Sequence, residues 1–245
     1  MRLIRVMCSG RVDLDFVLQA FSNGMDGVFI GGCRLNECNY VTQGNYHALT
    51  MALLCRKIME HIGLNPERLS IEFMSAGEGI RFVEVTNDFV KKVKELGPLG
   101  EGEGIDKEEL KSRLAEVRKL VPYIKIVKNE KLGARLNNNR EEDDTFFTSE
   151  EIDILFRDVV SYYIDPQKCQ ACTICARRCP AEAIISAKNE VHVIEQDKCI
   201  KCGTCFDVCP VRFAAVAKIT GEPVPPPLPE GERAIVRKAK EVEVA

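Results

Sequence analysis

Tryptophan is absent from this 245-residue sequence, and histidine occurs only three times, at His47, His61 and His192. The sequence also lacks an apolar run of the roughly 18–20 residues that a membrane-spanning helix needs. Neither sign of charge dominates, because 34 basic residues stand against 37 acidic ones for a net charge of −3. Binding to nucleic acid depends on concentrated positive charge, so this balance argues against a nucleic-acid partner.

Export signals and several enzyme motifs are missing as well. Arg2 and Arg5 interrupt the short apolar stretch at the start of the sequence, which argues against a signal peptide. There is no Walker motif, no G-x-G-x-x-G opening a helix, and no Ser-His-Asp arrangement that the local context supports. We therefore expect a cytoplasmic protein, either free or in a membrane-associated complex, without catalytic residues of its own.

Cysteine is what the sequence has in quantity. Eight of the 12 cysteines lie within residues 169–209 and four within residues 8–55. In a large chain without an export signal, cysteines more often hold metal or carry out redox chemistry than form disulfides. The gap between the two groups indicates two separate cysteine sites.

The alternation of apolar runs predicts the fold class. Residues 2–7, 27–31 and 69–74 are typical of strands, and residues 13–23, 45–62 and 75–96 of helices. This predicts a three-layer α/β domain with a parallel sheet over residues 1–97. A helical connector follows at 98–164, with helices at 106–120 and 149–164. Residues 165–220 are expected to form an α+β dicluster ferredoxin-like domain, and 221–245 a Pro-rich, charged tail that either wraps a partner or extends into solvent.

The ferredoxin prediction depends on an internal repeat. The pattern Cys-x2-Cys-x2-Cys-x3-Cys-Pro begins at Cys169 and recurs thirty residues later at Cys199. Three closely spaced cysteines reach three irons of one [4Fe–4S] cube, and the fourth, before proline, completes the other cube. One cluster is therefore expected to take Cys169, Cys172, Cys175 and Cys209, and the other Cys199, Cys202, Cys205 and Cys179. A pair of zinc ribbons is the alternative, but it leaves the third cysteine and the Cys-Pro of each repeat unexplained.

The N-terminal cysteines follow two predicted strands. Cys8 comes after the first strand, and Cys33 and Cys38 lie in the loop after the second. The carboxyl ends of parallel strands form the usual ligand crevice of such a sheet, so these three thiols are expected to converge there. Cys55 lies about 15 Å further along a helix and is interpreted as a buried free cysteine.

Several pieces of sequence around these cysteines resemble a known family. They are V-M-C-S-G-R (6–11), G-G-C-R-L-N-E-C-N-Y (31–40) and G-N-Y (44–46). They are similar to the delta subunit of methyl-viologen-reducing hydrogenase over residues 1–97, while residues 160–220 resemble bacterial dicluster ferredoxins. The first resemblance implies a [2Fe–2S] cluster at Cys8, Cys33 and Cys38, which passes electrons between a hydrogenase or formate dehydrogenase and a flavin-containing heterodisulfide reductase-like subunit.

Three thiolates leave a [2Fe–2S] site one ligand short. Members of the family usually carry a further cysteine-rich segment and a strand before the point where this sequence starts. We therefore expect that segment to be missing here and a partner subunit to supply the fourth cysteine. The alternative is that the N-terminal domain has lost its cluster and only docks.

The sequence thus predicts a non-catalytic electron-transfer subunit of an anaerobic multisubunit oxidoreductase, of the heterodisulfide reductase/hydrogenase or formate dehydrogenase type. Iron would be bound through the same cysteines, and single electrons would pass between partner redox centres. Its partners would be the flavin-containing subunit and a hydrogenase, formate dehydrogenase or other reductase subunit. A stand-alone flavin- or substrate-binding iron–sulfur oxidoreductase and an iron–sulfur sensor module are the alternatives.

Overall fold

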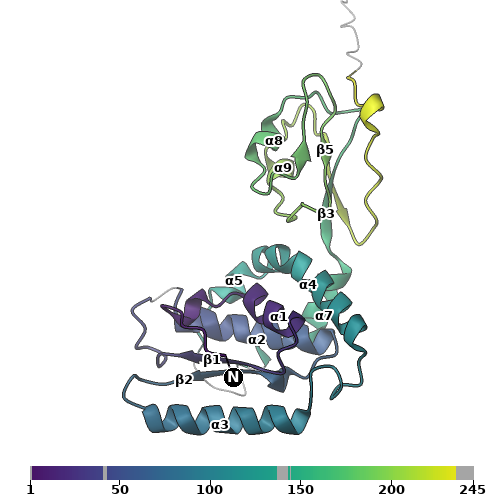
Figure 1. The fold of residues 1–245 in the computed structure, drawn as a ribbon. Helices are drawn as coiled ribbons and strands as arrows, with labels where there is room; N and C mark the ends of the chain where they lie inside the picture. The colour runs from purple at the N-terminus through teal and green to yellow at the C-terminus, as the bar shows by residue number, and fades with distance from the viewer. Residues whose placement is uncertain (1, 41–42, 137–142, 144, 236–245) are drawn as a thin grey trace, which may run out of the picture. The chain divides into compact units, whose positions relative to one another are not determined.

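The computed structural model describes residues 2–40, 43–136, 143 and 145–235. The chain divides into two compact units, Met1–Phe156 and Arg157–Ala245 (Figure 1). Residues 236–245, the charged end of the predicted tail, lie outside the described residues. In the described part of the chain, no helix is both long and apolar enough to cross a membrane.

A small parallel sheet lies at the centre of the first unit. Strand β1 (Val28–Gly32) pairs with β2 (Leu69–Phe73), with Val28 opposite Leu69 and Gly32 opposite Phe73. Helix α2 (Asn45–His61) connects them, which confirms the predicted strand–helix–strand order. Buried β-branched and aliphatic side chains at Ile30, Leu69 and Ile71 make these short segments strands.

The prediction of a strand at residues 2–7, the first of the three predicted strands, is wrong. This segment forms no strand, and the side chains of Leu3, Ile4 and Met7 are 82%, 83% and 93% exposed. Its apolar, β-branched composition is typical of a strand. The structure shows the physical reason for the error: no neighbouring element covers these side chains, so the burial that stabilises a strand is missing.

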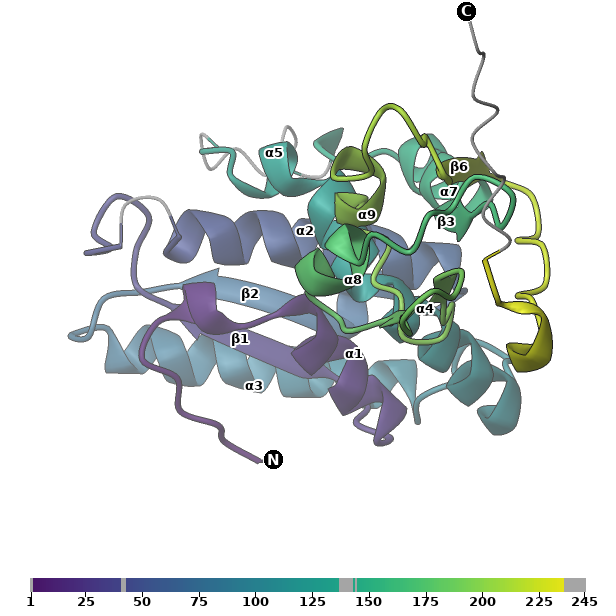
Figure 2. The ribbon, with the colours of Figure 1, turned by 90° about the horizontal axis from the view of Figure 1, so that it is seen from above.

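Helices lie on both sides of the sheet. Figure 1 shows α1 (Leu14–Ser22) and α2 on one side and α3 (Gly79–Leu96) on the other. Figure 2, seen from above, shows β1 and β2 side by side. The Asp13 carboxylate caps α1 by accepting a hydrogen bond from the backbone N–H of Asp15. Twelve residues of α2 are buried, whereas α3 buries none.

The predicted connector packs into this same unit. Its main helix, α4 (Lys107–Val127), begins at the expected cap Asp106 and packs against α1 and the short helix α5 (Asn129–Leu132). The preceding loop, 97–104, is held by Arg68 at the end of the 3₁₀ turn Pro66–Arg68. Helix α7 (Ser149–Arg157) completes the described connector.

The second unit begins with a strand where a helix was predicted. Helix α7 ends at Arg157, and β3 (Val160–Ile164) then pairs antiparallel with β6 (Val216–Thr220). The helix predicted for 149–164 is therefore wrong in its second half. Residues 160–164 read V-S-Y-Y-I, a β-branched and aromatic composition, and the partner strand lies more than fifty residues away in sequence.

Between those two strands lie the cysteine repeats and a hairpin. Strands β4 (Ile184–Ile185) and β5 (Val193–Ile194) pair antiparallel and form a hairpin between the two repeats. Asn189, in the turn of this hairpin, adopts the left-handed conformation at φ 63°. Each repeat carries one short helix, α8 (Ile174–Arg178) and α9 (Thr204–Asp207), and these two helices pack together.

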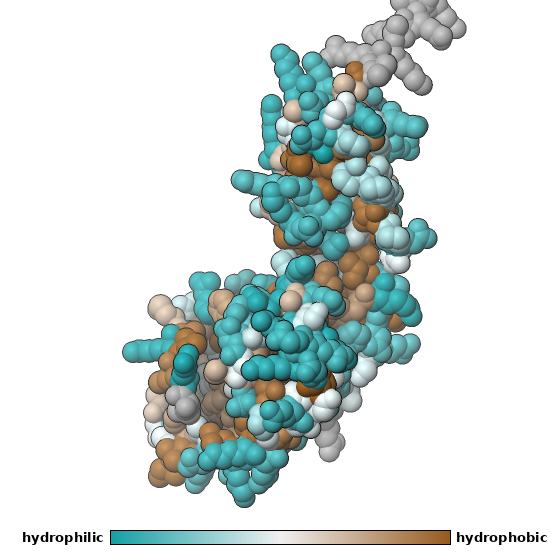
Figure 3. Space-filling model, turned by 45° about the vertical axis from the view of Figure 1, so that its right-hand side comes forward, coloured by the Kyte–Doolittle hydropathy of each residue, from teal (hydrophilic) through white to brown (hydrophobic). Residues whose placement is uncertain are grey.

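The described part of the Pro-rich tail returns to its own unit. The N–H of Val191 donates to the carbonyl of Arg233 at 2.7 Å, and the N–H of Ile235 donates to that of Asn189 at 3.0 Å. A 3₁₀ turn (Glu230–Glu232) separates these contacts from the prolines. Figure 3 shows apolar side chains among hydrophilic ones on the visible surface.

Candidate iron–sulfur sites

The two cysteine loops of the second unit have the same backbone conformation. In the first, Ala171 and Thr173 have positive φ angles of 49° and 61°. In the second, Lys201 and Gly203 stand thirty residues later with φ angles of 57° and 83°. Alternating right- and left-handed residues point successive backbone N–H groups into one concavity, a known form of iron–sulfur and anion site. The sequence repeat is thus a structural repeat.

The third cysteine of each repeat is buried and has the most strongly shifted pKa. Burial and the negative charges of Cys169, Cys172 and Cys209 raise the pKa of the Cys175 thiol to about 11. Burial and the charges of Cys199, Cys175 and Cys202 raise the pKa of Cys205 to about 12. Each third cysteine therefore lies among the thiols of its own repeat, and Cys175 and Cys205 lie near each other.

The fourth cysteines lie beside the opposite repeat. Cys209 belongs to the second repeat but is close enough to Cys175 for its charge to raise that pKa. Cys179 belongs to the first repeat, and its charge, after the larger effect of burial, raises the pKa of Cys199. This proximity is what the predicted exchange of fourth cysteines requires.

Backbone N–H groups point at several of the sulfurs. Ala183 N–H donates to Cys179 Sγ at 3.3 Å, and Ala215 N–H donates to Cys209 Sγ at the same distance. Lys201 N–H donates to Cys199 Sγ at 3.4 Å. Such donors stabilise thiolates, which are the form of cysteine that binds iron. Thiolates gathered in one place repel one another, and a cationic iron–sulfur core offsets that repulsion. The sulfur ligands and the amide donors around them therefore fit an iron–sulfur cluster.

The zinc alternative would use the cysteine pairs of the two repeats. Zinc draws four ligands around a single ion, with sulfur about 2.3 Å from the metal. Two pairs suffice for one such ion, so a zinc site gives no role to the third cysteine or to the Cys-Pro of each repeat.

The three N-terminal thiols meet at the carboxyl end of β1, as expected. Cys8 Sγ lies 3.9 Å from Cys38 Sγ. Burial, a hydrogen bond with Cys38 and the charges of Cys38 and Cys8 raise the pKa of Cys33. Burial opposes ionisation of Cys38, but the backbone N–H groups of Tyr40 and Asn45 outweigh it and lower the pKa of Cys38. The loop thus favours ionisation of Cys38 over that of Cys33.

Residues outside the cysteines fix the shape of this loop. Asn45 Nδ2, at the start of α2, donates to the carbonyls of Cys33 and Arg34 at 3.0 and 2.6 Å. Gly44 has no room for a side chain, because a Cβ there would overlap Cys38 Sγ. The sequence motif G-N-Y at 44–46 contains both residues. Their contacts with the cysteine loop are evident only in the folded structure.

An ion pair ties the cysteine loop to the segment before α3. Arg34 Nε donates to Glu78 Oε2 at 2.9 Å, and the backbone N–H of Ser75 donates to the same oxygen at 2.7 Å. The hydrogen bonds from Arg34 and Ser75 lower the pKa of Glu78. The predicted capping box at Ser75 and Glu78 therefore forms in part, and the helix itself starts at Gly79.

Cys55 does not take part in either site. It is fully buried on α2, between Met51 and Met59, and burial raises the pKa of its thiol to about 12. This confirms its interpretation as a buried free cysteine.

The fold and the cysteine groups define a two-domain iron–sulfur protein, and comparison with known proteins gives the family. Residues 1–97 match the family described as methyl-viologen-reducing hydrogenase, delta subunit, and residues 163–216 match the 4Fe-4S dicluster domain. The chain belongs to the methyl-viologen-reducing hydrogenase delta subunit family. The dicluster match supports two [4Fe–4S] clusters.

Individual relatives are similar to the first 97–99 residues, which make up 40% of this chain. An iron-sulfur subunit of the F420-non-reducing hydrogenase from Archaeoglobus profundus is 43% identical over 97 residues, and 70% of its length is covered. The corresponding vhc iron-sulfur subunit from Methanococcus voltae is also 43% identical, with 67% covered.

A larger relative contains a similar segment. It is a subunit of the ferredoxin/F(420)H(2)-dependent CoB-CoM heterodisulfide reductase from Methanosarcina acetivorans, and it is 46% identical over 99 residues. The chain spans only 12% of the length of that relative. These similarities confirm the predicted class, an electron-transfer iron–sulfur subunit of an anaerobic oxidoreductase.

Proposed function

We propose that this protein relays single electrons between redox centres of partner subunits in a complex of the heterodisulfide reductase/hydrogenase or formate dehydrogenase type. The observation that carries the proposal is the proximity of each fourth cysteine to the opposite repeat, because Cys209 acts on the pKa of Cys175 and Cys179 acts on that of Cys199. Two cubanes with exchanged ligands are the arrangement of bacterial two-cluster ferredoxins, which carry electrons.

The proposal assigns the ligands as follows. The first cluster, which we call cluster I, takes three cysteines of the first repeat and the last of the second: Cys169, Cys172, Cys175 and Cys209. Cluster II takes the complementary set: Cys199, Cys202, Cys205 and Cys179. When bound, each cluster supplies a site that gains or loses one electron. The chain holds the two sites close together, because the charge of Cys175 acts on Cys205.

A [2Fe–2S] cluster at Cys8, Cys33 and Cys38 is the second part of the proposal. The donor chemistry supports it, since three sulfurs converge and two backbone N–H groups favour a thiolate at Cys38. The remaining cysteine of this unit, Cys55, is buried about 15 Å along α2 from that loop. We therefore propose that the fourth thiolate comes from a partner subunit.

The proposed partners follow from the names of the relatives. Those proteins are subunits of hydrogenases and of heterodisulfide reductases. We propose a flavin-containing heterodisulfide reductase-like subunit on one side and a hydrogenase, formate dehydrogenase or other reductase subunit on the other. The exposed side chains of Leu3, Ile4 and Met7 are proposed to be covered in such a complex.

Counting iron and acid-labile sulfide tests this function. The full chain, reconstituted anaerobically, is expected to hold about eight irons and eight sulfides, because two cubanes contain that number. The same count on the complex purified with its partners is expected to rise by about two of each per copy of this chain, the content of one [2Fe–2S] cluster. Fewer than two cubanes would contradict the relay.

Two other outcomes distinguish the parts of the proposal. About ten irons in the isolated chain, with a [2Fe–2S] spectrum, would contradict the ligand from a partner and leave the relay intact. Stoichiometric flavin, or turnover by the isolated chain, would contradict the non-catalytic role and support a stand-alone oxidoreductase.

A further inference from the structure

His192 lies against one of the proposed cluster ligands. It directly precedes β5 and is 1% exposed. Its Nδ1 atom lies 3.5 Å from Cys175 Sγ, within hydrogen-bonding distance of a sulfur acceptor. His47 and His61 belong to the first unit, so His192 is the sole histidine in the sequence of the second.

The chemistry of the contact selects one form of the imidazole ring. A cysteine bound to iron is a thiolate and has no proton to donate. Only the ring can then donate, so Nδ1 must carry the proton. The other tautomer would direct the Nδ1 lone pair at a negative sulfur and leave a buried Nε2–H unpaired, which is unfavourable.

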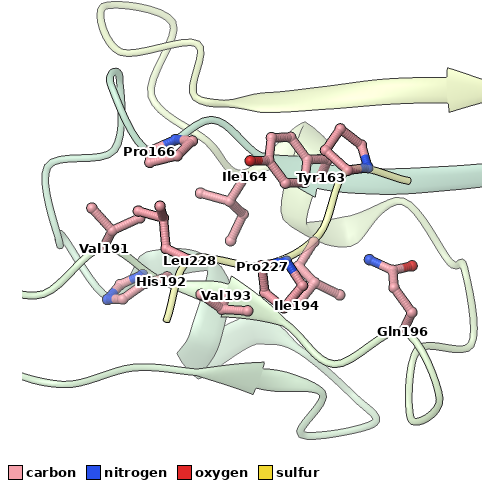
Figure 4. A pocket seen from close by; sticks show the side chains of 11 residues that line it. Tyr163, Ile164, Pro166, Val191, His192, Val193, Ile194, Gln196, Pro227 and Leu228 are labelled. Carbon is pink, nitrogen blue, oxygen red and sulfur yellow. The ribbon is translucent and has the colours of Figure 1, made fainter. Parts of the chain in front are cut away.

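The surroundings keep the ring buried. The ring borders a cavity of about 30 Å³, and Figure 4 shows Pro227 and Leu228 of the tail at this cavity, with Val191 and Val193 from the hairpin. Among the described residues, Nε2 is a buried atom without a hydrogen-bond partner. The sulfur of Cys175 is thus the hydrogen-bond partner that the described residues give this ring.

The other repeat carries a different residue at the equivalent place. Thirty residues before His192, Tyr162 lies in β3, as the repeat spacing requires. Tyr162 approaches the second cysteine loop, where its hydroxyl would lie 2.7 Å from a Cβ built on Gly203. Its ring also packs against Phe206 with 6.3 Å between centroids. The two cluster sites therefore differ in the side chain that covers them.

We propose that His192 is a positioning residue that raises the reduction potential of cluster I above that of cluster II, so that the electron rests on cluster I. This inference depends on the proposed function. Reduction adds one electron to a cluster, with no bond formed or broken and no proton transferred. A hydrogen bond to a ligand sulfur stabilises that added negative charge, and so favours the reduced state.

The first test uses the unmodified full chain. Protein labelled with ¹⁵N-histidine is reduced until one cluster has accepted its electron, and pulsed EPR detects nitrogen near that cluster. We expect a ¹⁵N coupling at this first stage of reduction, because His192 is the only histidine in the sequence of the second unit. A coupling that appears only with the second electron would overturn the order of potentials.

The second test compares two substitutions. In His192→Leu the donor is lost, whereas in His192→Asn an amide N–H can replace Nδ1–H. We expect His192→Leu to lower the reduced-to-oxidised ratio of cluster I at least threefold at a fixed potential. A tenfold change would correspond to about 59 mV. His192→Asn is expected to restore most of that ratio, and Ile194→Val, a buried apolar change in β5, to leave it unchanged.

The outcomes separate this inference from the relay itself. Two intact cubanes with unchanged potentials in His192→Leu would overturn the role of His192 and leave the relay standing. An equal shift in Ile194→Val would show that packing, and not the donor, sets the potential. Absence of two cubanes from the unmodified chain would contradict the proposed function instead.

Discussion

At the scale of the residue, His192, Asn45 and Gly44 contact the cysteines or shape their loops. The fixed spacing and the repeat interval of thirty residues predict which sulfurs share a loop, whereas these three neighbours gave weaker signals. Each acts on a cysteine from a separate segment of chain, and such a contact is decided by tertiary packing.

Arg68 is a residue whose importance only the structure shows. Its side chain is fully buried, pairs with Glu103 at 2.5 Å, and donates to the carbonyls of Asp26 and Gly97. The sequence of the loop 98–104, P-L-G-E-G-E-G, is typical of a flexible linker. The structure instead fastens this loop to the first unit through the Arg68 guanidinium and through hydrogen bonds such as that from Leu99 N–H to Asp26 Oδ1 at 2.8 Å.

Replacing Arg68 by methionine is expected to destabilise the first unit by about 3–5 kcal/mol. The substitution leaves the Glu103 carboxylate buried and without its charged partner, which is the costly way to break such a pair. Urea unfolding followed by circular dichroism measures the effect. Arg81→Met, which removes a half-exposed ion pair with Glu72 at 3.5 Å, is the control and should cost less than about 1 kcal/mol. Equal losses would contradict this role.

The same pair predicts a dependence on pH. Burial opposes ionisation of Glu103, but hydrogen bonds from Arg68 and from two backbone N–H groups outweigh it and lower the pKa of Glu103. A lowered pKa in the folded state means that the stabilisation is complete above the usual glutamate pKa and is lost as pH falls through the folded value.

We therefore expect the free-energy difference between the wild type and Glu103→Gln to be largest near pH 7 and to shrink below about pH 4.5. Urea unfolding of both proteins across this range provides the measurement. Glu67→Gln, which alters an exposed pair with Lys92, serves as the control and should show little change with pH. A difference that grows on acidification would contradict the assignment.

At the scale of the element, local signals placed most helices, and long-range pairing decided the strands. Asp13 and Asp106 cap the helices that follow them. The strand β3 was mistaken for helix because its stabilising partner, β6, lies far along the chain. The prediction for residues 2–7 was wrong in the opposite direction. Their composition is typical of a strand, but they form none, because no described element covers their side chains.

The Pro-rich segment gives a prediction at this scale. Pro225, Pro227 and Leu228 line the cavity beside His192, and Arg233 joins the segment to the hairpin. A chain ending at Gly221 is expected to assemble both cubanes but to lose them several-fold faster in air, because solvent gains access to the side of Cys175. Visible absorbance follows the bleaching.

The control for that experiment is a chain ending at Ile235, which keeps every described contact of the segment. It is expected to bleach at the rate of the full chain. If both truncated chains bleach alike, the segment does not shield the cluster, and its contacts serve another purpose.

At the scale of the whole molecule, the two units carry two kinds of cysteine site. The family match covers the first unit up to residue 97, and the dicluster match lies within the second. The sequence predicted both classes of domain. It could not predict that the connector packs into the first unit. That packing depends on a contact between α4 and α1, which are separated by more than eighty residues in the sequence.

The central claim is that two neighbouring cubanes share this unit through exchanged fourth ligands, and EPR of the reduced full chain tests it most directly. Two adjacent reduced clusters are expected to give a spectrum broadened by their interaction. Cys209→Ala should leave the same single-cluster signal as Cys172→Ala, while Cys179→Ala should match Cys202→Ala. If Cys209→Ala matches Cys202→Ala instead, the fourth ligands are not exchanged and the account is contradicted.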